Sequence, residues 1–177
     1  KITGLSLSAS ESPNFLSSGD LDGDGLTDLV IGAGDQDGGQ GAVFVIYGQE
    51  GGYTNFDASS LPPTSFKISG NGGRFGSCVE ARSDLNGDGR SEIIIGAKFQ
   101  PNGGAVYVVY GQETRGTSFH IDSLSDPAGF KINGFSGGRV GDGLSYAGDF
   151  NGDERDDFIV GATGTQGRGY VVYGKEE

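Results

Sequence analysis

The chain has 177 residues, of which 36 are glycine, and a formal net charge of -12. This charge disfavours nucleic acid and anionic membrane surfaces as partners. The high glycine content and 34% hydrophobic residues disfavour a packed α-helical protein, and the single cysteine Cys78 excludes an intrachain disulfide framework. No apolar run approaches the ~20 residues that span a bilayer, so membrane insertion is not expected.

In chain order, the sequence repeats itself about every 65 residues. The opening segment at residues 1–4 returns at residues 67–70 and 131–134. A short strand is expected next, around residues 15–19, and again around residues 77–83 and 143–148. Each of these strands leads into an acidic loop, at residues 20–28, 84–92 and 149–157.

Two apolar runs follow each loop. The first ends in Gly-Ala and lies at residues 29–33, 93–97 and 158–162, and the second ends in Tyr-Gly and lies at residues 42–48, 105–111 and 170–174. These runs are short, rich in β-branched and aromatic residues, and bounded by glycine, which indicates strands. A further strand is expected at residues 66–70 and 130–134, and no stretch longer than a turn shows helical periodicity.

The acidic loops share one pattern of oxygen-bearing side chains. Acidic or amide residues occupy positions 1, 3, 5 and 9, position 4 is glycine, and position 6 is glycine in two of the loops. The residues are Asp20, Asp22, Asp24 and Asp28; Asp84, Asn86, Asp88 and Glu92; and Asp149, Asn151, Asp153 and Asp157. Such residues also make ordinary turns between strands, but three copies in register favour loops that bind Ca²⁺, a cation that takes six to eight oxygen ligands.

These repeats predict an all-β chain of three four-stranded antiparallel blades of the β-propeller type. We expect one domain over residues 1–177, with blade units at about 5–70, 71–134 and 135–177. The third unit lacks its fourth strand, whereas residues 1–4 form a strand without a unit. The N-terminal strand is therefore expected to complete the last blade, either within the chain or in a neighbouring chain.

Three blades are unlikely to close a ring, because propellers have about four to eight. Two chains could form a closed six-bladed dimer, whereas a head-to-tail contact by strand exchange that does not close would give a filament. The chain is equally consistent with part of a longer propeller that supplies further blades. An isolated monomer is the least favoured state, because it leaves a strand edge unpaired.

Three motifs together resemble the FG-GAP repeat of integrin α-subunit propellers and of many secreted bacterial proteins. These are Phe75-Gly76, the loop at residues 84–92, and Ile95-Gly96-Ala97. The resemblance covers nearly the whole chain in three units. It implies up to three Ca²⁺ ions, one in each hairpin between the first and second strands of a blade, with ligands at positions 1, 3, 5, 7 and 9. Position 7 contributes the main-chain carbonyls of Leu26, Arg90 and Arg155.

The sequence departs from the family pattern at a few places. Asn14-Phe15-Leu16 and Val140-Gly141 stand where Phe-Gly is expected, which puts the packing of those blades in question. Glu154 replaces the glycine at position 6, so the third loop either accepts a strained backbone or binds calcium more weakly. An EF-hand or dockerin reading requires a carboxylate at position 12, where this chain has isoleucine or valine.

The leading hypothesis is an extracellular, secreted or cell-surface calcium-binding module with a structural or adhesive role, in which Ca²⁺ rigidifies the loops. The alternative is a ligand-binding propeller, lectin-like or protein-docking, whose face is lined by aromatic residues such as Tyr53, Phe56 or Phe135. An enzyme is not expected, because His120 is the only histidine and no nucleophile has a recognisable triad setting. A protein or a glycan is thus the expected kind of ligand.

Overall fold

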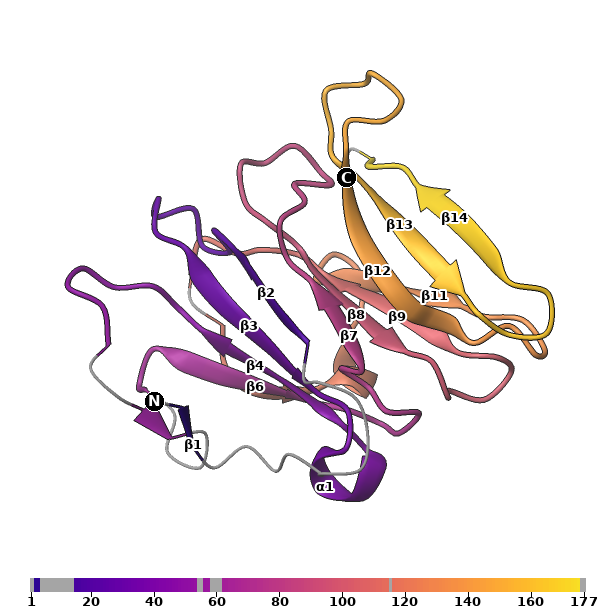
Figure 1. Ribbon diagram of the computed structural model, residues 1–177. Helices are drawn as coiled ribbons and strands as arrows, with labels where there is room; N and C mark the ends of the chain where they lie inside the picture. The colour runs from indigo at the N-terminus through magenta and orange to yellow at the C-terminus, as the bar shows by residue number, and fades with distance from the viewer. Residues whose placement is uncertain (1, 4–14, 54–55, 58–61, 115, 176–177) are drawn as a thin grey trace.

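A computed structural model describes residues 2–3, 15–53, 56–57, 62–114 and 116–175. Within these residues the regular secondary structure is almost entirely β. One small sheet has two strands, and three larger, mainly antiparallel sheets stack side by side in sequence order (Figure 1). The all-β prediction is therefore confirmed. The sheets are stacked without closing into a ring.

Each of the three larger sheets is an up-and-down antiparallel arrangement, and the first also has one parallel edge strand that comes from a later connection. The first has the order β10 (Phe119–His120), β6 (Ser65–Ser69), β4 (Ala42–Ile46), β3 (Asp28–Ala33) and β2 (Leu16–Gly19). The second has the order β11 (Gly129–Asn133), β9 (Ala105–Val109), β8 (Ile93–Ala97) and β7 (Cys78–Glu80). The third has the order β12 (Val140–Gly148), β13 (Asp157–Ala162) and β14 (Arg168–Val172).

The N-terminal strand differs from the prediction. The strand β1 (Ile2–Thr3) pairs in parallel with β5 (Phe56–Asp57), in the connection between β4 and β6. Completion of the last blade by the N-terminal strand within one chain is therefore wrong for this structure, and in the described residues the third sheet ends at β14. The physical reason is local, since β5 offers a strand edge much closer along the chain. Completion in a neighbouring chain stays a prediction.

The parallel strand β10 was also not expected. It belongs to the connection between β9 and β11 of the second sheet, yet it pairs with β6 of the first sheet. The ring of Phe119 stacks on that of Phe66, with centroids 6.5 Å apart. This apolar contact holds the connection across the boundary between the first two sheets.

Two apolar cores fill the spaces between successive sheets. The first joins β3, β4 and β6 to β8 and β9, and the second joins β8 and β9 to β12 and β13. Cys78 is buried, and its burial raises the pKa of the thiol to about 11, as expected of a core cysteine. Because both faces of the second sheet are covered at its central strands, those at residues 93–97 and 105–109 are apolar and buried at every position.

Paired glycines allow the sheets to approach at their inner strands. A Cβ on Gly32 would lie 2.3 Å from the carbonyl oxygen of Gly76, and one on Gly96 would lie 2.2 Å from that of Gly141. Gly76 and Gly141 share a positive φ of 85° and 87°. The packing of Val140-Gly141 thus repeats that of Phe75-Gly76, and Val140 is buried like its counterpart. Asn14 lies outside the described residues.

Helix is limited to two short turns in the described part of the chain, α1 (Gln36–Gly39) and the 3-10 turn η1 (Ile121–Ser123). Neither has the length or the apolar content that a membrane-crossing helix needs.

Candidate metal sites

The three acidic loops project from the same end of the stack (Figure 1). Each connects the first two strands of its sheet, between β2 and β3, between β7 and β8, and between β12 and β13. The next loop along the chain therefore lies beside the preceding one, in the neighbouring sheet.

The first carboxylate of each loop is enclosed by main-chain N–H groups. Asp20 accepts hydrogen bonds from the N–H groups of Gly23 at 2.8 Å and Gly25 at 2.9 Å. Asp84 and Asp149 accept the corresponding pairs at distances between 2.6 and 2.9 Å. The same loop conformation is thus built three times, around an acidic residue at position 1.

Position 6 requires a left-handed backbone in all three loops. Its φ is 82° at Gly25, 85° at Gly89 and 68° at Glu154. A side chain in this region costs roughly 1–2 kcal/mol relative to glycine. The third loop therefore accepts the strained backbone that its sequence suggested.

The carboxylate at position 9 closes the base of each loop. Asp28 has no exposed surface, and it accepts hydrogen bonds from the N–H groups of Leu21 at 2.7 Å and Gly48 at 2.8 Å. The equivalent acids of the other two loops are equally buried and make the equivalent bonds. Glu92 accepts from Leu85 and Gly111, and Asp157 accepts from Phe150 and Gly174.

The glycine that ends the third strand of each unit belongs to this arrangement, although sequence reasoning gave it no role. A Cβ at Gly48, Gly111 or Gly174 would lie between 2.6 and 2.9 Å from atoms of the loop region. Only glycine brings its N–H to the buried carboxylate without displacing the backbone. The signal was present in the sequence as the repeated Tyr-Gly that follows each second apolar run.

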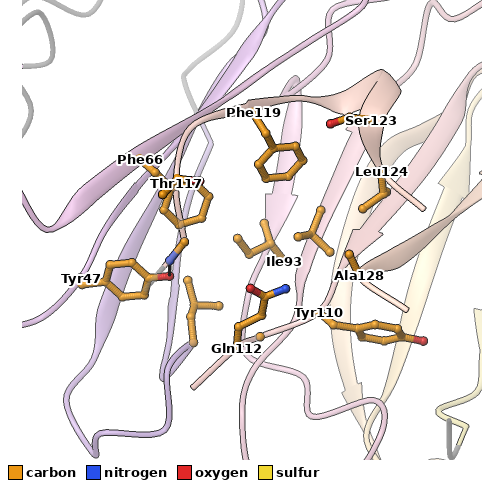
Figure 2. Close-up of a pocket in the computed structure, with 14 residues that line it drawn as sticks. Tyr47, Phe66, Ile93, Tyr110, Gln112, Thr117, Phe119, Ser123, Leu124 and Ala128 are labelled. Carbon is orange, nitrogen blue, oxygen red and sulfur yellow. Dashed lines mark hydrogen bonds between the residues drawn. The ribbon is translucent and has the colours of Figure 1, made fainter. Parts of the chain in front are cut away.

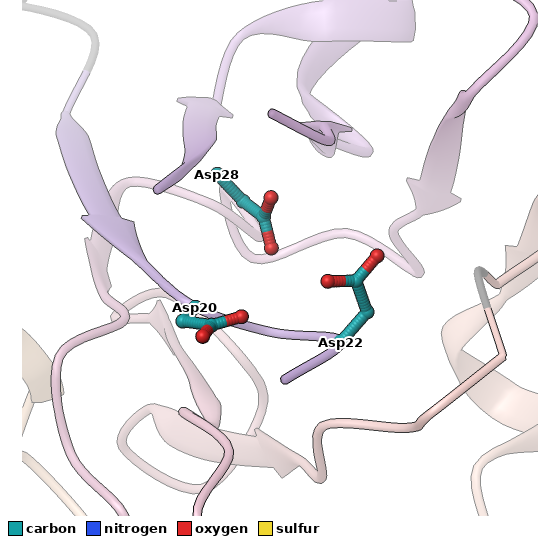
Figure 3. Close-up of side chains that lie close together, drawn as sticks. All are labelled: Asp20, Asp22 and Asp28. Atoms are coloured by element: carbon teal, nitrogen blue, oxygen red, sulfur yellow. The ribbon is translucent and has the colours of Figure 1, made fainter. Parts of the chain in front are cut away.

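Carboxylate oxygens gather in the first two loops. Oxygens of Asp20, Asp22 and Asp28 all lie within 4.8 Å of one another, and their side chains point into a shared space (Figure 3). In the second loop, the corresponding group consists of Asp84, Asp88 and Glu92. Carboxylate oxygens at this spacing are suited to a hard divalent cation.

Burial makes two of these carboxylates costly to ionise. It raises the pKa of Asp28 to about 6 and that of Glu92 to about 8, even though main-chain N–H groups act in the opposite direction. Neighbouring acids in the same loops contribute to both increases. A bound cation is the group that would offset this charge.

The remaining predicted ligands are more exposed. Asp24 is exposed and accepts a hydrogen bond from the N–H of Leu26 at 2.8 Å. The side chain of Arg90 pairs with Asp88 at 2.9 Å, and Asn86 donates its amide to the same aspartate at 3.3 Å. The carbonyls at position 7, those of Leu26, Arg90 and Arg155, stay predictions as ligands.

The third loop is open. Asp149, Asn151 and Asp153 are all exposed, and within the described residues the acids of this loop do not form a group like the other two. The first two loops are covered by the following unit, which also donates N–H groups to their carbonyls. Asp20 O accepts from Ser91 at 2.8 Å, Leu21 O from Gln112 at 3.0 Å, Asp84 O from Asp156 at 3.0 Å and Leu85 O from Lys175 at 2.8 Å.

The residues considered for catalysis and for ligand binding lie outside the acidic loops. His120 is exposed and accepts a hydrogen bond from the N–H of Asp122 on its Nδ1 atom. Tyr53 is half-buried and donates its hydroxyl to the carbonyl of Tyr47, and Phe135 stacks edge-on against Tyr170. The side chain of Phe56, in β5, lies outside the described residues.

An apolar pocket of about 250 Å³ lies between the first two sheets (Figure 2). Tyr47, Phe66 and Ile93 form part of its wall, and the N–H of Gly116 donates to the hydroxyl oxygen of Tyr47 at 2.9 Å. Gln112 supplies an amide. Besides that amide, the polar side chains of its described lining are the hydroxyls of Tyr47, Tyr110, Thr117 and Ser123, and the described lining includes no acid, histidine, cysteine or basic side chain.

Comparison with known families gives a match to the FG-GAP repeat at residues 12–46 and 79–109. These ranges fall in the first and second units and include the whole acidic loop of each. The assignment of residues 135–177 as a third repeat stays a prediction.

Several characterised proteins are similar to this chain. Integrin alpha-PS5 of Drosophila melanogaster is 32% identical over 154 residues, which are 83% of this chain and 14% of that protein. Integrin alpha-4 of Xenopus laevis is 31% identical over 150 residues, 81% of this chain and 13% of that protein. Phosphatidylinositol-glycan-specific phospholipase D of Rattus norvegicus is 33% identical over 133 residues, 67% of this chain and 15% of that protein. The chain thus spans only about one-seventh of the length of these relatives.

Proposed function

The chain belongs to the FG-GAP repeat family, and from this premise we propose that it is a calcium-binding β-propeller module that acts outside the cell in adhesion or surface assembly. Its role is structural rather than enzymatic. Residues 1–177 form one domain of three blade units, at about 5–70, 71–134 and 135–177. The cell-surface setting and the adhesive role are proposed from the similarity to integrin alpha chains.

The observation that carries the calcium proposal is the burial of the acid at position 9 beside two other carboxylates. Asp28 and Glu92 have no exposed surface, and burial raises the pKa of both. Several carboxylates held this close repel one another, and Ca²⁺ would supply the compensating positive charge. The side chains at positions 1, 3, 5 and 9 and the carbonyl at position 7 would hold the ion.

Calcium has a mechanical consequence at this position. In the first two loops, main-chain carbonyls accept hydrogen bonds from the following unit. Those of Asp20 and Asp84 are examples. An ion that fixes the loop therefore also fixes the boundary between sheets. Because a ligand that binds only the folded state stabilises it, calcium should raise the free energy of unfolding.

Thermal unfolding of the 177-residue chain tests this function. The melting temperature should rise with calcium and fall when a chelator is added, and magnesium should have a smaller effect. Asp20→Asn and Asp84→Asn should each reduce the calcium-dependent rise, whereas Asp122→Asn, an exposed acid outside the loops, should not. A melting temperature that calcium leaves unchanged would refute the metal role and leave the loops as turns.

A second candidate function, the docking of an anionic ligand, is favoured by one surface cluster. Phe99 is 46% exposed, and the cationic groups of Arg74, Lys98 and Arg139 lie 5.3, 5.5 and 5.5 Å from its ring centroid. The cluster lies at the end of β8 remote from the acidic loop. In a chain of net charge -12, it would attract an acidic protein segment or a sialylated or sulfated glycan.

A glycan array and a panel of acidic peptides test the docking function. Binding that Phe99→Ala and Arg139→Ala weaken, and that added salt reduces, would support it. Binding to neutral sugars that is indifferent to both substitutions would contradict it.

A further inference from the structure

The pocket between the first two sheets has a mainly apolar floor and a polar rim (Figure 2). We use floor for its buried lining residues and rim for its exposed ones. The floor includes Tyr47, Phe66 and Ile93, which are 3%, 5% and 3% exposed. The rim includes Gln112 and Thr117. A molecule that enters the pocket therefore passes polar groups first and meets mostly apolar surface inside.

The connection between β9 and β11 closes the pocket. It leaves the second sheet after β9, pairs with the edge of the first sheet through β10, and returns to the second sheet at β11. Phe119, Leu124 and Ala128 of this connection line the pocket together with residues of both sheets. Because one chain supplies the two sheets and the connection, the pocket forms without a further unit or a partner.

The size of the pocket and the aromatic rings of its lining favour a flat ring as the ligand. The ring of Phe66 lies 5.8 Å from that of Tyr47 and 6.5 Å from that of Phe119, measured between centroids. Another aromatic ring can add offset or edge-on contacts to these side chains, which an aliphatic group of the same volume cannot. An apolar cavity of about 150 Å³ holds benzene. The volume here, about 250 Å³, is enough for one ring with a short substituent.

Gln112 supplies a polar group for such a ligand. Its side chain points into the pocket (Figure 2), and its carboxamide makes no hydrogen bond with another described residue. Its main chain is held in place, since its N–H donates to the carbonyl of Leu21 at 3.0 Å. A carboxamide can both donate and accept a hydrogen bond. It can therefore pair with a hydroxyl or an amide of a ligand.

We propose that this pocket binds a small aromatic molecule that carries one uncharged hydrogen-bonding group, such as a phenolic hydroxyl. The ring lies on the floor against Phe66 and Phe119, and the polar group pairs with Gln112. The described lining contains no charged side chain, so a charged ligand would lose its hydration without gaining a counter-ion. The site goes beyond the proposed function, and neither calcium nor the docking of an anionic ligand is needed for it.

Two fluorinated probes test the proposal on the 177-residue chain. Fluorobenzene and para-fluorophenol share the ring and differ by the hydroxyl, and fluorine NMR follows the binding of each. Both should bind, and para-fluorophenol should bind about threefold to tenfold more tightly, because only its hydroxyl can pair with Gln112. Unlabelled phenol should displace fluorobenzene at a lower concentration than cyclohexanol does, because only phenol has an aromatic ring.

Three variants locate the site. Ala128→Leu fills part of the pocket, while hydrogen bonds with Ser125 and Tyr110 hold the main chain at Ala128. It should weaken the binding of both probes by about tenfold or more. Ala147→Leu makes the same change at a half-buried alanine of β12 outside the pocket and should leave binding unchanged. Gln112→Leu should remove the advantage of para-fluorophenol and preserve the binding of fluorobenzene.

Several results would overturn the proposal. These are no binding of either probe at millimolar concentrations, equal loss of binding in Ala128→Leu and Ala147→Leu, and equal displacement by phenol and cyclohexanol. If Ala128→Leu does not fold, nuclear Overhauser effects decide the location in the unaltered chain. Bound para-fluorophenol should show them to the methyl groups of Thr117 and Leu124, and their absence would place the probe elsewhere. Titrations with calcium and with chelator show failure of the metal role separately.

Discussion

Replacement of Glu92 by glutamine tests whether ionisation of the buried acid at position 9 lowers the free energy of unfolding. Burial raises the pKa of Glu92 from 4.5 to about 8. In metal-free protein, the unfolded chain loses this proton near pH 4.5, whereas the folded chain keeps it until about pH 8. Stability therefore falls as the pH rises between these values, by about 1.4 kcal/mol for each pH unit or about 5 kcal/mol in all.

Glutamine removes the titration and keeps the shape. Its carbonyl accepts one of the two N–H groups that Glu92 binds, those of Leu85 and Gly111, but its amide cannot accept the other. The unsatisfied donor costs roughly 1–3 kcal/mol at every pH. Asp28, whose pKa burial raises to about 6, contributes a similar decline below pH 6 in both proteins. The interval from pH 6 to 8 therefore isolates Glu92.

Urea unfolding between pH 5 and pH 9 measures the difference. With chelator, the wild-type chain should lose about 3 kcal/mol between pH 6 and 8, whereas Glu92→Gln should lose almost none. With calcium, the wild-type decline should shrink, because the ion compensates the ionised carboxylate. Glu113→Gln makes the same chemical change at an exposed acid and should follow the wild type. An equally steep decline in Glu92→Gln would refute the reasoning.

Four further substitutions, one of them a control, probe the backbone and a buried glutamate. At Gly111 a Cβ would lie 2.7 Å from a carbonyl oxygen, so Gly111→Ala should cost about 2 kcal/mol in urea unfolding, whereas Gly169→Ala, with no atom within 4 Å, should be neutral or slightly stabilising. Burial raises the pKa of Glu80, but hydrogen bonds, chiefly those from Arg82, outweigh it and lower the pKa to about 2. Glu80→Gln should therefore cost about 2 kcal/mol of stability at pH 7. Near pH 2 it should cost nothing, because the wild type has lost this stabilisation there. Glu154→Gly should raise stability by about 1 kcal/mol, since it relieves a φ of 68°, and an unchanged melting temperature would contradict that strain.

The repeat made most of the fold predictable. Each acidic loop is followed by an apolar run that becomes β3, β8 or β13, because β-branched residues bounded by glycine have few alternatives to a strand. The family resemblance also placed each loop between the first and second strands of its unit, as the structure has it. Because its two counterparts are glycine, Glu154 was recognised from sequence as a position of either a strained backbone or weaker calcium binding.

Contacts between segments far apart in sequence were not predictable in the same way. The parallel pairing of β10 with β6 joins residues about 50 apart and depends on the packing of Phe119 on Phe66, which no local pattern encodes. The pairing of β1 with β5 was not predictable either, because residues 1–4 resemble residues 67–70 and 131–134, whose strands β6 and β11 pair instead with β4 and β9. The second role of the acid at position 9, as acceptor for the N–H of Gly48, required the turn geometry to be known.

Neighbouring units also give the loops different environments, although their sequences are similar. The side chain of Arg90 lies over Gly23 of the first loop, and that of Arg155 lies over Gly87 of the second. The third loop has no such neighbour in the described part of the chain. A loop that is held by a neighbour loses less conformational freedom when it binds an ion, so binding is stronger.

Calcium should therefore bind the third loop most weakly. Its residues at positions 1 and 3, Asp149 and Asn151, are exposed, whereas in the first loop Asp20 is half-buried and Asp22 is buried. In a calorimetric titration, Asp153→Asn should remove only the weakest binding step, and Asp22→Asn should remove a tighter one. Loss of the tightest step in Asp153→Asn would show that the neighbouring unit does not set the order of affinities.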